Sequence, residues 1–447
     1  MNEENYKIFE INSDKYIFFR DYLSIYKLED DILVDYFENR KDFSQKDKKE
    51  INNLFKEANK KLDTFSFAKV PQYLTSLCLI LTRNCNLRCK YCYAFDEKKE
   101  NELDMSFEIA KKAIDYLLET DLDTMGYSIV FFGGEPLMNK KIMDEVIDYC
   151  YTEIKEKRGK FVGFAMTTNG IIMNDDIAKY LKQHNFSLQV SIDGLKENHD
   201  KNRILPNGKG SYDIIIKNID YLKKANVSFM THSTFDTHIN LYDTLIELER
   251  LKNPFSYGFT LDTLDKSKDI TSYTKIELSK LRNDYEKIIE FYLNKYINNE
   301  IVYCQNIGNY LMKIKNRIGK EIGCTSGKAM ISVLPNGTII PCQNFQKMEE
   351  FYQGNITDNV IYQNTVYANH VDENETCKKC WMKYFCGGGC FYEKYINNGN
   401  TFDPPLAKCE VYKIQAEYFL KLYVKLEELG IISRLEEKSS SNSQLNI

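Results

Sequence analysis

The chain has 447 residues, 43% of them hydrophobic, and its 60 basic and 65 acidic side chains leave a formal net charge of −5. These values predict roughly three domains with full apolar cores and exclude a disordered, collagen-like or coiled-coil chain. The slightly acidic balance excludes binding to nucleic acid through phosphate neutralisation. The polar first residues are unlike an export signal, and no apolar run approaches the roughly 20 residues of a membrane helix, so we expect a cytoplasmic protein.

Residues 1–70 have the pattern of a small unit of mixed strands and helices. Two short apolar runs flank the turn residues 12–14 and predict a hairpin, with a third strand at 24–27. Helical spacing follows at 32–37 and 51–62. We expect a winged-helix-like α+β domain, whose balanced charge favours a peptide along a sheet edge over DNA.

Strands and helices alternate from residue 77 onward. Strand-like runs occur at residues 77–81, 128–132, 163–167, 187–192, 228–233 and 257–261. Helical spacing occurs at residues 106–119, 140–157, 174–184, 212–225 and 241–252. This alternation predicts a parallel α/β sheet, either open or curled into a barrel. Because the carboxyl ends of parallel strands meet at one edge, the motifs that follow the strands should gather there.

The last third of the chain changes character. Residues 275–318 are expected to be mostly helical, and residues 323–410 are rich in cysteine and turn residues. Only short apolar pieces occur there, at 330–334 and 338–341, so we expect metal ligation to stabilise this region in place of a large core. A closing helix is predicted at 407–429.

Thirteen cysteines, an odd number, form the most informative pattern of the chain. In a chain without an export signal, clustered cysteines indicate metal ligands or catalysts. Ten of them fall into two groups with tight spacing. The remaining three are Cys78, Cys150 and Cys304, and we interpret Cys78 and Cys150 as small buried apolar side chains.

The first group follows the first predicted strand with the spacing C-x3-C-x2-C, at Cys85, Cys89 and Cys92. Three such thiolates can hold one cuboidal iron–sulfur cluster and leave an iron without a protein ligand. A zinc site would need a fourth ligand, and no histidine lies nearby. The motif resembles the radical S-adenosylmethionine (radical SAM) family. In that family the open iron binds SAM, whose reductive cleavage yields a 5′-deoxyadenosyl radical.

Further residues match positions that bind SAM in this family. The family's GGEP segment, which contacts the SAM amino group, matches Gly133, Gly134, Glu135 and Pro136. The resemblance assigns Ser191 to holding SAM and Arg203 to pairing with its methionine carboxylate. Tyr91 matches an aromatic position near adenine. Two further candidates for SAM contacts are Asn169 and Asp193.

The second group resembles the seven-cysteine SPASM extension of peptide-modifying radical SAM enzymes, which holds two auxiliary four-iron clusters. The resemblance assigns a distal set of ligands, Cys377, Cys380, Cys386 and Cys409. It assigns a nearer set, closer to the active site, of Cys324, Cys342 and Cys390. A zinc ribbon remains the alternative for the pair Cys377 and Cys380 alone.

The ligand count suggests a substrate. Three four-iron clusters offer about twelve irons, of which SAM would take one, so ten thiolates face about eleven places. One iron of the nearer cluster is then open, unless Cys304 closes it. Because ligation to metal favours thiolate, an open iron suits the binding of a cysteine side chain of the substrate.

The whole resemblance implies a radical SAM peptide maturase that forms a thioether from a cysteine sulfur to a carbon atom. Its partners would be a ribosomally made precursor peptide and an electron donor such as flavodoxin or ferredoxin, with no nucleic acid and no membrane. The expected domains are a leader-recognition domain at 1–70, a partial (β/α)6 barrel at 71–265, a helical linker at 266–322, the iron–sulfur SPASM domain at 323–435 and a disordered tail at 436–447.

Three alternatives stay open. The first is an anaerobic sulfatase maturase, which forms formylglycine. In that group the chain starts close to the first cysteines, whereas 84 residues precede Cys85 here, and an aspartate stands where Gln343 follows Cys342. The second is a maturase that forms carbon–carbon or carbon–oxygen crosslinks. The third is a non-catalytic iron–sulfur protein that binds peptides or transfers electrons.

Overall fold

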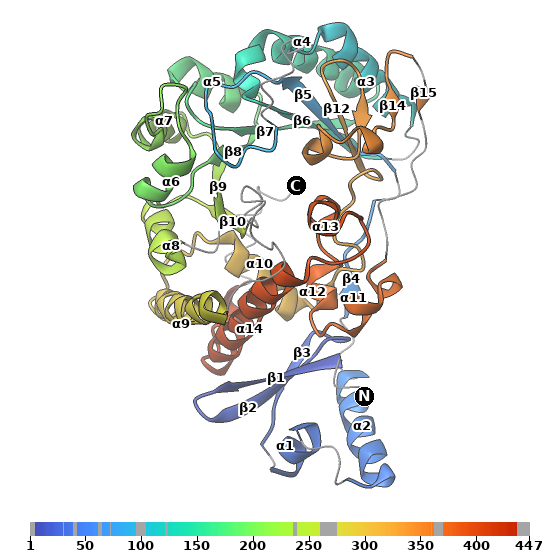
Figure 1. Ribbon diagram of the computed structural model, residues 1–447, viewed down its shortest axis with the longest axis vertical. Coiled ribbons are helices and arrows are strands. Elements are labelled where there is room, and N and C mark those ends of the chain that lie inside the picture. Colours follow the sequence, from blue (N-terminus) through green and yellow to red (C-terminus); the bar gives the residue numbers. More distant parts are fainter. Residues whose placement is uncertain are drawn as a thin grey trace.

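The structure is a computed structural model (Figure 1). It describes residues 5–29, 31–38, 43–60, 65–71, 73–94, 104–120, 124–235, 239–259, 275–358, 360–361 and 370–435. The tail predicted at 436–447 lies outside these residues. Within them, no helix combines the length and the apolar character that crossing a membrane requires.

An eight-stranded sheet forms the centre of the molecule, in the order β10-β9-β8-β7-β6-β5-β12-β13. Its strands are β5 (Ser76–Thr82), β6 (Gly126–Gly133), β7 (Phe161–Thr168), β8 (Ser187–Ser191), β9 (Phe229–Phe235), β10 (Phe255–Phe259), β12 (Met330–Val333) and β13 (Ile339–Ile340). All neighbours pair in parallel except β12 and β13. The predicted α/β fold with a parallel sheet is confirmed, and all six predicted strands are present.

Helices cover the outer face of this curved sheet (Figure 1). They are α3 (Phe107–Glu119), α4 (Lys140–Cys150), α5 (Asp175–Gln183), α6 (Lys196–Asn202), α7 (Tyr212–Lys224) and α8 (Leu241–Arg250), and a π-helical turn, Tyr151–Glu156, continues α4. Residues spaced three and four apart face inward, as in α3 with its buried Ala110, Ala113, Ile114 and Leu117. Ser106, Asn174 and Asn240 cap the starts of α3, α5 and α8.

The cysteine-rich region is built into the barrel sheet. Its two apolar pieces form β12 and β13, and β12 pairs in parallel with β5 through Ser332 and Cys78. The buried side chains of Ile331 and Val333 belong to the main core. The expectation that this region lacks a share in a large core therefore needs correction, because β12 extends the barrel sheet and its side chains join the main core. The expected stabilisation by metal ligation stays a prediction.

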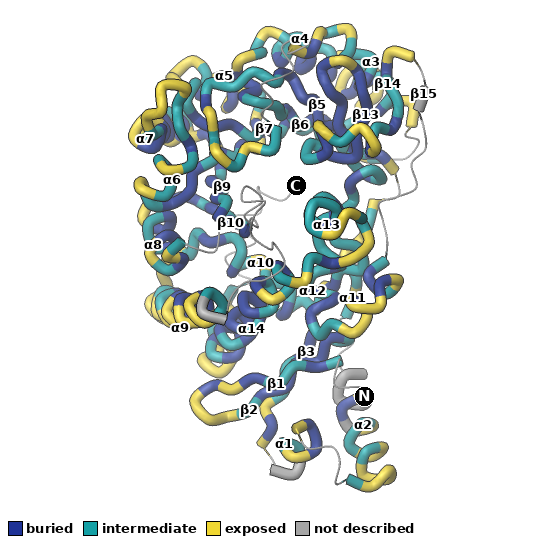
Figure 2. The backbone as a smooth tube through the Cα atoms, viewed as in Figure 1, coloured by how far each residue is buried: buried dark blue, intermediate teal, exposed yellow. Residues whose placement is uncertain are grey.

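Six α-helices lie in the described part of the chain after β10. They are α9 (Lys275–Ile297), α10 (Gln305–Asn316), α11 (Glu375–Lys379), α12 (Lys383–Cys386), α13 (Phe391–Asn398) and α14 (Leu406–Glu428). The predicted closing helix is α14, which packs against α9 and α10 with much of its surface buried (Figure 2). A short hairpin joins β14 (Gly354–Asn355) to β15 (Val360–Ile361).

The N-terminal unit is a three-stranded antiparallel sheet with two helices. It comprises β1 (Tyr6–Ile11), β2 (Asp14–Phe19), β3 (Ser24–Lys27), α1 (Asp31–Glu38) and α2 (Gln45–Lys60). One face of the sheet packs with Phe37 and Phe55 in a core of its own. The other face, with Phe9 and Phe18, belongs to the main core. The linker strand β4 (Ser66–Phe67) pairs with β11 (Ile318–Gly319).

Candidate functional site

A cavity of about 590 Å3 lies at the carboxyl ends of the barrel strands. Residues that end or follow six consecutive strands line it, so the predicted convergence of motifs occurs. The predicted site residues that line it are Cys85, Cys89, Tyr91, Cys92, Gly133, Gly134, Asn169, Ser191 and Arg203. Further lining residues directly follow two of the nearer cysteines, with Gln343 and Asn344 after Cys342, and Tyr392 and Glu393 after Cys390.

The cysteine loop, residues 85–92, is held by its backbone. The N–H groups of Arg88 and Lys90 donate to the carbonyls of Ile204 and Asn202, at 2.7 and 3.0 Å. Burial raises the pKa of the Cys85 thiol, and raises that of Cys89 to about 11 against the opposing charge of Arg203. Protonated thiols of this kind must lose protons when they bind iron.

Gly133 and Gly134 allow the end of β6 to touch the start of this loop. A Cβ atom on Gly133 would lie 2.2 Å from the Thr82 carbonyl oxygen, and one on Gly134 would lie 2.1 Å from that of Asn84. The Gly134 N–H donates to the Thr82 carbonyl at 2.8 Å. These contacts are backbone to backbone, so a side chain has no room there.

Glu135 lies behind the cavity wall and is fully buried. Its two carboxylate oxygens accept hydrogen bonds at 2.8 Å, one from the Thr168 hydroxyl and the other from the Asn169 N–H. Burial raises the pKa of Glu135 to about 7, and these hydrogen bonds oppose the rise. Glu135 thus joins the end of β6 to that of β7 beside the buried Pro136, and its predicted contact with the SAM amino group stays a prediction.

Tyr91, Asp193 and Arg203 form one buried network. An Asp193 oxygen accepts from the Tyr91 hydroxyl at 2.6 Å and from Arg203 Nε at 2.9 Å. The Arg203 guanidinium also lies 5.3 Å from the centre of the Tyr91 ring. Burial alone would lower the pKa of Arg203, but Asp193 and Tyr91 raise it, so the guanidinium stays charged. Of the three, Asp193 does not line the cavity and orients the other two.

His199 supports this network and was not predicted from the sequence. Its Nδ1 accepts from the Asp193 N–H at 3.2 Å, and its Nε2 lies 2.9 Å from the Ser211 hydroxyl, which donates to the Arg203 carbonyl at 2.8 Å. Burial lowers the pKa of His199 to about 4, so the ring is neutral near pH 7. The sequence did offer one indication of this role, because His199 stands four residues before Arg203 on the short helix α6.

The distal set shares a second cavity, of about 280 Å3, which also receives Cys390. Burial raises the pKa of Cys409 to about 12, and the charges of the other three distal thiols contribute. Burial also raises the pKa of Cys390 to about 12, and the thiols that contribute there are Cys342 and Cys324. The assignment of these thiols to two separate sets stays a prediction, since Cys390 interacts with the nearer thiols and also lines the distal cavity. Their ligation of iron stays a prediction.

Several thiols in a buried, roomy pocket suit a multinuclear cluster held by cysteine. The described residues contain no group of three His, Cys, Asp or Glu side chains that would close on a single metal ion. Cysteines of the nearer set stand on separate segments, with Cys342 just after β13 and Cys390 at the start of α13.

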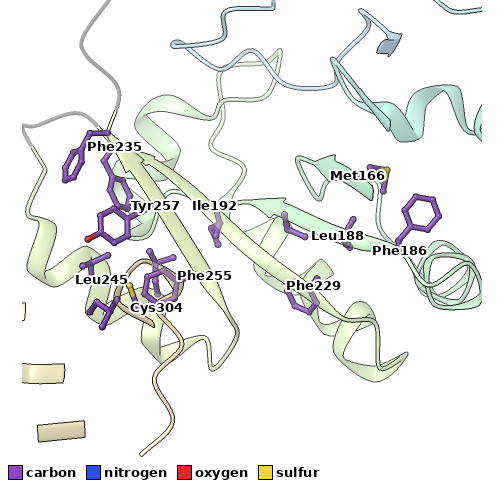
Figure 3. Packing of buried hydrophobic residues seen from close by; sticks show 14 of the residues in the cluster. Met166, Phe186, Leu188, Ile192, Phe229, Phe235, Leu245, Phe255, Tyr257 and Cys304 are labelled. Carbon is purple, nitrogen blue, oxygen red and sulfur yellow. The ribbon is translucent and has the colours of Figure 1, made fainter. Parts of the chain in front are cut away.

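Cys304 lies apart from both sets. Figure 3 shows it packed beside Leu245, Phe255 and Tyr257 in the barrel core. Its N–H donates to Glu249 at 3.2 Å, and its side chain is 1% exposed. Cys304 is therefore a core residue in this structure, and its packing gives no support for a role as a ligand of the nearer set. Cys78, on β5, is the buried thiol whose charge interacts with Cys342.

Other lining residues were not singled out in the sequence. They include Tyr93, Gln189, His232, Tyr392, Glu393, Asn397 and Lys408. His232 and Gln189 stand on the inward-facing positions of β9 and β8, which strand alternation would have indicated. No sequence pattern marks Glu393 or Lys408 as a lining residue, because only the fold brings α13 and α14 to the mouth of the barrel.

Residues 79–252 match the family described as the Radical SAM superfamily, and this range holds the cysteine loop, the GGEP segment and Arg203. These residues form a radical SAM domain. An uncharacterized protein of Methanocaldococcus jannaschii, MJ0907, is 39% identical over 153 residues, which are 34% of this chain and 50% of that protein. The chain therefore spans half the length of this relative.

The similarity to other relatives extends beyond the radical SAM domain. The cysteine-type anaerobic sulfatase-maturating enzyme of Clostridium novyi is 27% identical over 350 residues, 74% of this chain and 91% of that protein. The solved structure of native anSMEcpe with bound AdoMet has a TM-score of 0.66 at 20% identity, covering 79% of this chain and 99% of that one. Streptococcus suis SuiB bound to precursor peptide SuiA has a TM-score of 0.52 at 15% identity, covering 91% and 98%. These likenesses show a shared fold.

Proposed function

We propose that this radical SAM protein modifies a ribosomally made precursor peptide by joining a cysteine sulfur to a carbon atom. One observation carries the proposal. A single cavity of about 590 Å3 is lined both by the residues matched to SAM and by residues next to the nearer cysteines. A substrate in this cavity would contact both groups of residues.

The residues matched to SAM would bind and orient the cofactor. Arg203 is buried, charged and fixed by Asp193, which suits a carboxylate partner. Tyr91 presents its ring to the cavity, and Gly133 and Gly134 bring backbone groups close to the cysteine loop. Bound at a reduced four-iron cluster, SAM would supply the deoxyadenosyl radical that removes a hydrogen atom from the substrate.

Other lining residues of the cavity suit a peptide. They include the amide side chains of Gln343, Asn344 and Asn397. An amide donates and accepts hydrogen bonds, as a peptide backbone does, so these side chains match main-chain groups without selecting particular residues. The nearer set offers three thiols, and Cys304 is packed elsewhere. An open place for the substrate's sulfur is consistent with this arrangement.

The proposed bond balances as follows. Joining C–H to S–H with loss of both hydrogens releases one hydrogen atom, one proton and one electron. The hydrogen atom forms 5′-deoxyadenosine, the proton leaves the cysteine thiol, and an auxiliary cluster accepts the electron.

Formylglycine formation is the second candidate, since the Clostridium novyi relative is a sulfatase-maturating enzyme. Two observations favour the thioether. Gln343, which cannot act as a carboxylate base, lines the cavity directly after Cys342. Among the described lining residues Glu393 is the single carboxylate, and it is paired with the buried Lys408.

The remaining parts of the proposal concern partners. We assign leader recognition to residues 1–70, whose sheet has β1 and β3 at its edges, because an extended peptide can add a strand to an edge. Reduction of the SAM-binding cluster requires an electron donor such as flavodoxin or ferredoxin, and the cytoplasm is the expected location. Three four-iron clusters are the proposed cofactor set.

Product analysis separates the two candidates. A cysteine-bearing precursor encoded beside the gene should lose two hydrogens per crosslink and keep its sulfur, whereas formylglycine formation removes the sulfur. Mass spectrometry before and after thiol alkylation distinguishes these products. Replacement of Cys85, Cys89 and Cys92 by alanine should abolish deoxyadenosine formation. Deoxyadenosine produced by that variant would contradict the assignment of the SAM site.

The open place on the nearer set has its own test. Cys304→Ala and Cys78→Ala should keep the wild-type iron content and crosslink the precursor, whereas Cys390→Ala should lose the nearer cluster and crosslinking but keep SAM binding. Loss of that cluster in Cys78→Ala or Cys304→Ala would show that protein closes the site, and direct ligation of substrate sulfur would then be wrong.

A further inference from the structure

The N-terminal sheet covers the segment that carries most of the distal set. Residues 377–386 hold three of its four cysteines, on α11, α12 and the loop between them. Phe18, in β2, is fully buried against this segment. Its ring stacks on Phe385 with centroids 5.2 Å apart and meets Trp381 edge-on at 6.1 Å. Phe385 is the residue directly before Cys386.

Arg20 adds hydrogen bonds to the same place. Its side chain is 6% exposed, and its Nη1 donates to the carbonyls of Lys378 and Cys380 at 2.8 and 3.2 Å. The other guanidinium nitrogens are held inside the N-terminal unit, by Asp21 at 3.0 Å and by Asn5. Arg20 therefore links the N-terminal unit to the backbone between the first two distal cysteines.

The linker after α2 extends this cover. The rings of Phe65 and Phe67 pack on Tyr384, with centroids 6.1 and 5.0 Å apart. The distal cavity itself is lined by other groups of the same segment, including Cys377, Cys380 and Met382. Thus one side of residues 377–386 faces the cavity, and residues from the first 70 contact other parts of the segment.

A guanidinium in this position can control geometry as well as packing. It donates to two carbonyls of one tight loop, and planar, fixed donors impose a spacing on their acceptors. Groups that orient the ligands of a cluster influence its affinity and its reduction potential. The opposite face of the N-terminal sheet packs on Phe37 and Phe55, so a shift of this sheet would involve both cores.

We propose that Arg20 is a positioning residue for the distal cluster and couples the N-terminal domain to it. The inference rests on the cofactor set proposed above and goes beyond it. In this arrangement the domain assigned to the leader forms part of the cluster's outer support. Coupling between two sites is reciprocal. A cluster bound at residues 377–386 should therefore stabilise the N-terminal sheet, and the folded N-terminal sheet should favour binding of the cluster.

The first test uses the reconstituted full chain. Arg20→Met should change the reduced electron paramagnetic resonance signal of the distal cluster or remove that cluster, with a loss of up to about four of about twelve irons. Deoxyadenosine formation without peptide should continue, because Arg20 is outside the SAM site. Arg20→Lys, which keeps a charged donor, should restore part of the wild-type signal. Lys15→Met, which removes an ion pair to Glu38 within the N-terminal unit, is the matched control.

Cys409→Ala provides the reference for loss of the distal cluster. If Cys409→Ala keeps all its iron, the cofactor assignment fails. If Cys409→Ala loses the cluster while Arg20→Met keeps the wild-type signal and iron content, the coupling alone is overturned. Should Arg20→Met fail to fold by circular dichroism, Phe18→Leu replaces it, with the same spectral change expected and an unchanged spectrum counting against the proposal.

The second test measures the reverse direction. Cys409→Ala should increase amide hydrogen exchange in β2, on the N-terminal sheet, and leave exchange in α3, on the outside of the barrel, unchanged. Equal protection of β2 in the wild type and in Cys409→Ala would overturn the coupling.

Discussion

Buried polar side chains organise the proposed SAM site at the scale of single residues. The charge of Arg203 is compensated by Asp193. The neutral ring of His199 accepts from the Asp193 N–H and reaches the Arg203 carbonyl through the Ser211 hydroxyl. A neutral ring is required, because Nδ1 must accept from the Asp193 N–H while Nε2 faces the Ser211 hydroxyl. Burial thus selects the protonation state that the network needs.

This protonation state predicts a pH dependence of stability. Since the pKa of His199 falls from 6.5 to about 4 on folding, the unfolded chain binds the extra proton between these values. His199 should therefore lower stability as the pH falls from about 6.5 to about 4, by about 3 kcal/mol at most. Denaturant unfolding at several pH values should show a shallower acid loss in His199→Gln than in the wild type.

The pH dependence of the wild type alone would not isolate His199, because Glu135 changes the stability with pH in the opposite direction. Its pKa rises from 4.5 to about 7, so its contribution falls as the pH rises through this range. An unchanged slope in His199→Gln would show that this ring is not the titrating group. His184→Gln, at a half-buried position, should alter the slope less.

The ion pair between Lys408 and Glu393 predicts an asymmetric mutational effect. Both residues line both cavities, and the Lys408 side chain is 2% exposed. Lys408→Met leaves the half-buried carboxylate of Glu393 without its partner and should cost about 1 to 3 kcal/mol, whereas adding Glu393→Gln should recover part of this loss. Lys413→Met breaks a half-exposed pair with Glu410 and should cost less than about 1 kcal/mol. Equal losses, measured by denaturant unfolding, would contradict the pair's buried role.

At the scale of elements, close backbone crossings position the cysteine segments. Gly323, just before Cys324, lies against the glycine run 387–389, which separates Cys386 from Cys390. A Cβ atom at Gly323 would lie 2.4 Å from the Gly389 carbonyl oxygen. The segments that carry the nearer set can approach each other only because no side chain stands between them.

Two glycine substitutions should therefore have opposite effects. Gly323→Ala should push Cys324 away from Cys390 and reduce iron bound at the nearer set, with loss of crosslinking. Gly308→Ala, in α10 with no atom within 4 Å of the added Cβ, should stabilise the protein by about 0.5 to 1 kcal/mol through helix propensity. Iron analysis and thermal unfolding measure both. Full iron content in Gly323→Ala would show that this crossing does not set the position of Cys324.

At the scale of the whole molecule, the N-terminal unit and the cysteine-rich region both contribute side chains to the main core. One face of the N-terminal sheet belongs to the main core, and β12 extends the barrel sheet from β5. Ion pairs continue this contact, with Lys7 binding Glu417 of α14. The proposed leader binding at the first 70 residues and the proposed chemistry in the cavity would thus occur on one packed unit.

Deletion of residues 1–70 should consequently do more than weaken binding of a leader. It uncovers one side of Phe385 and of Trp381. A large aromatic side chain buries on the order of 150 to 250 Å2 in all, and part of that area would become exposed. The shortened chain should unfold at a lower temperature and bind a hydrophobic dye more strongly than the full chain. An unchanged unfolding temperature would show that the N-terminal unit is an independent module.

The sequence by itself determined the strands, most helices and the chemistry at their ends. Alternation of apolar residues is a local property, so it indicated β5 to β10 directly. The C-x3-C-x2-C and GGEP motifs act through residues adjacent in the chain, and Gly133 and Arg203 line the cavity as placed. Four of the seven later cysteines, those that the resemblance assigns to the distal set, line one cavity, which Cys390 also lines.

Only the tertiary structure decided which distant segments meet. The pairing of β12 with β5 joins residues about 250 positions apart, and short apolar runs do not specify their partner strand. The burial of Glu135 against the end of β7 and the hydrogen bond from Asp193 to His199 both depend on several elements packing together. The contacts of Phe18 and Arg20 with residues 377–386 arise in the same way, because the surface that covers this segment comes from the other end of the chain.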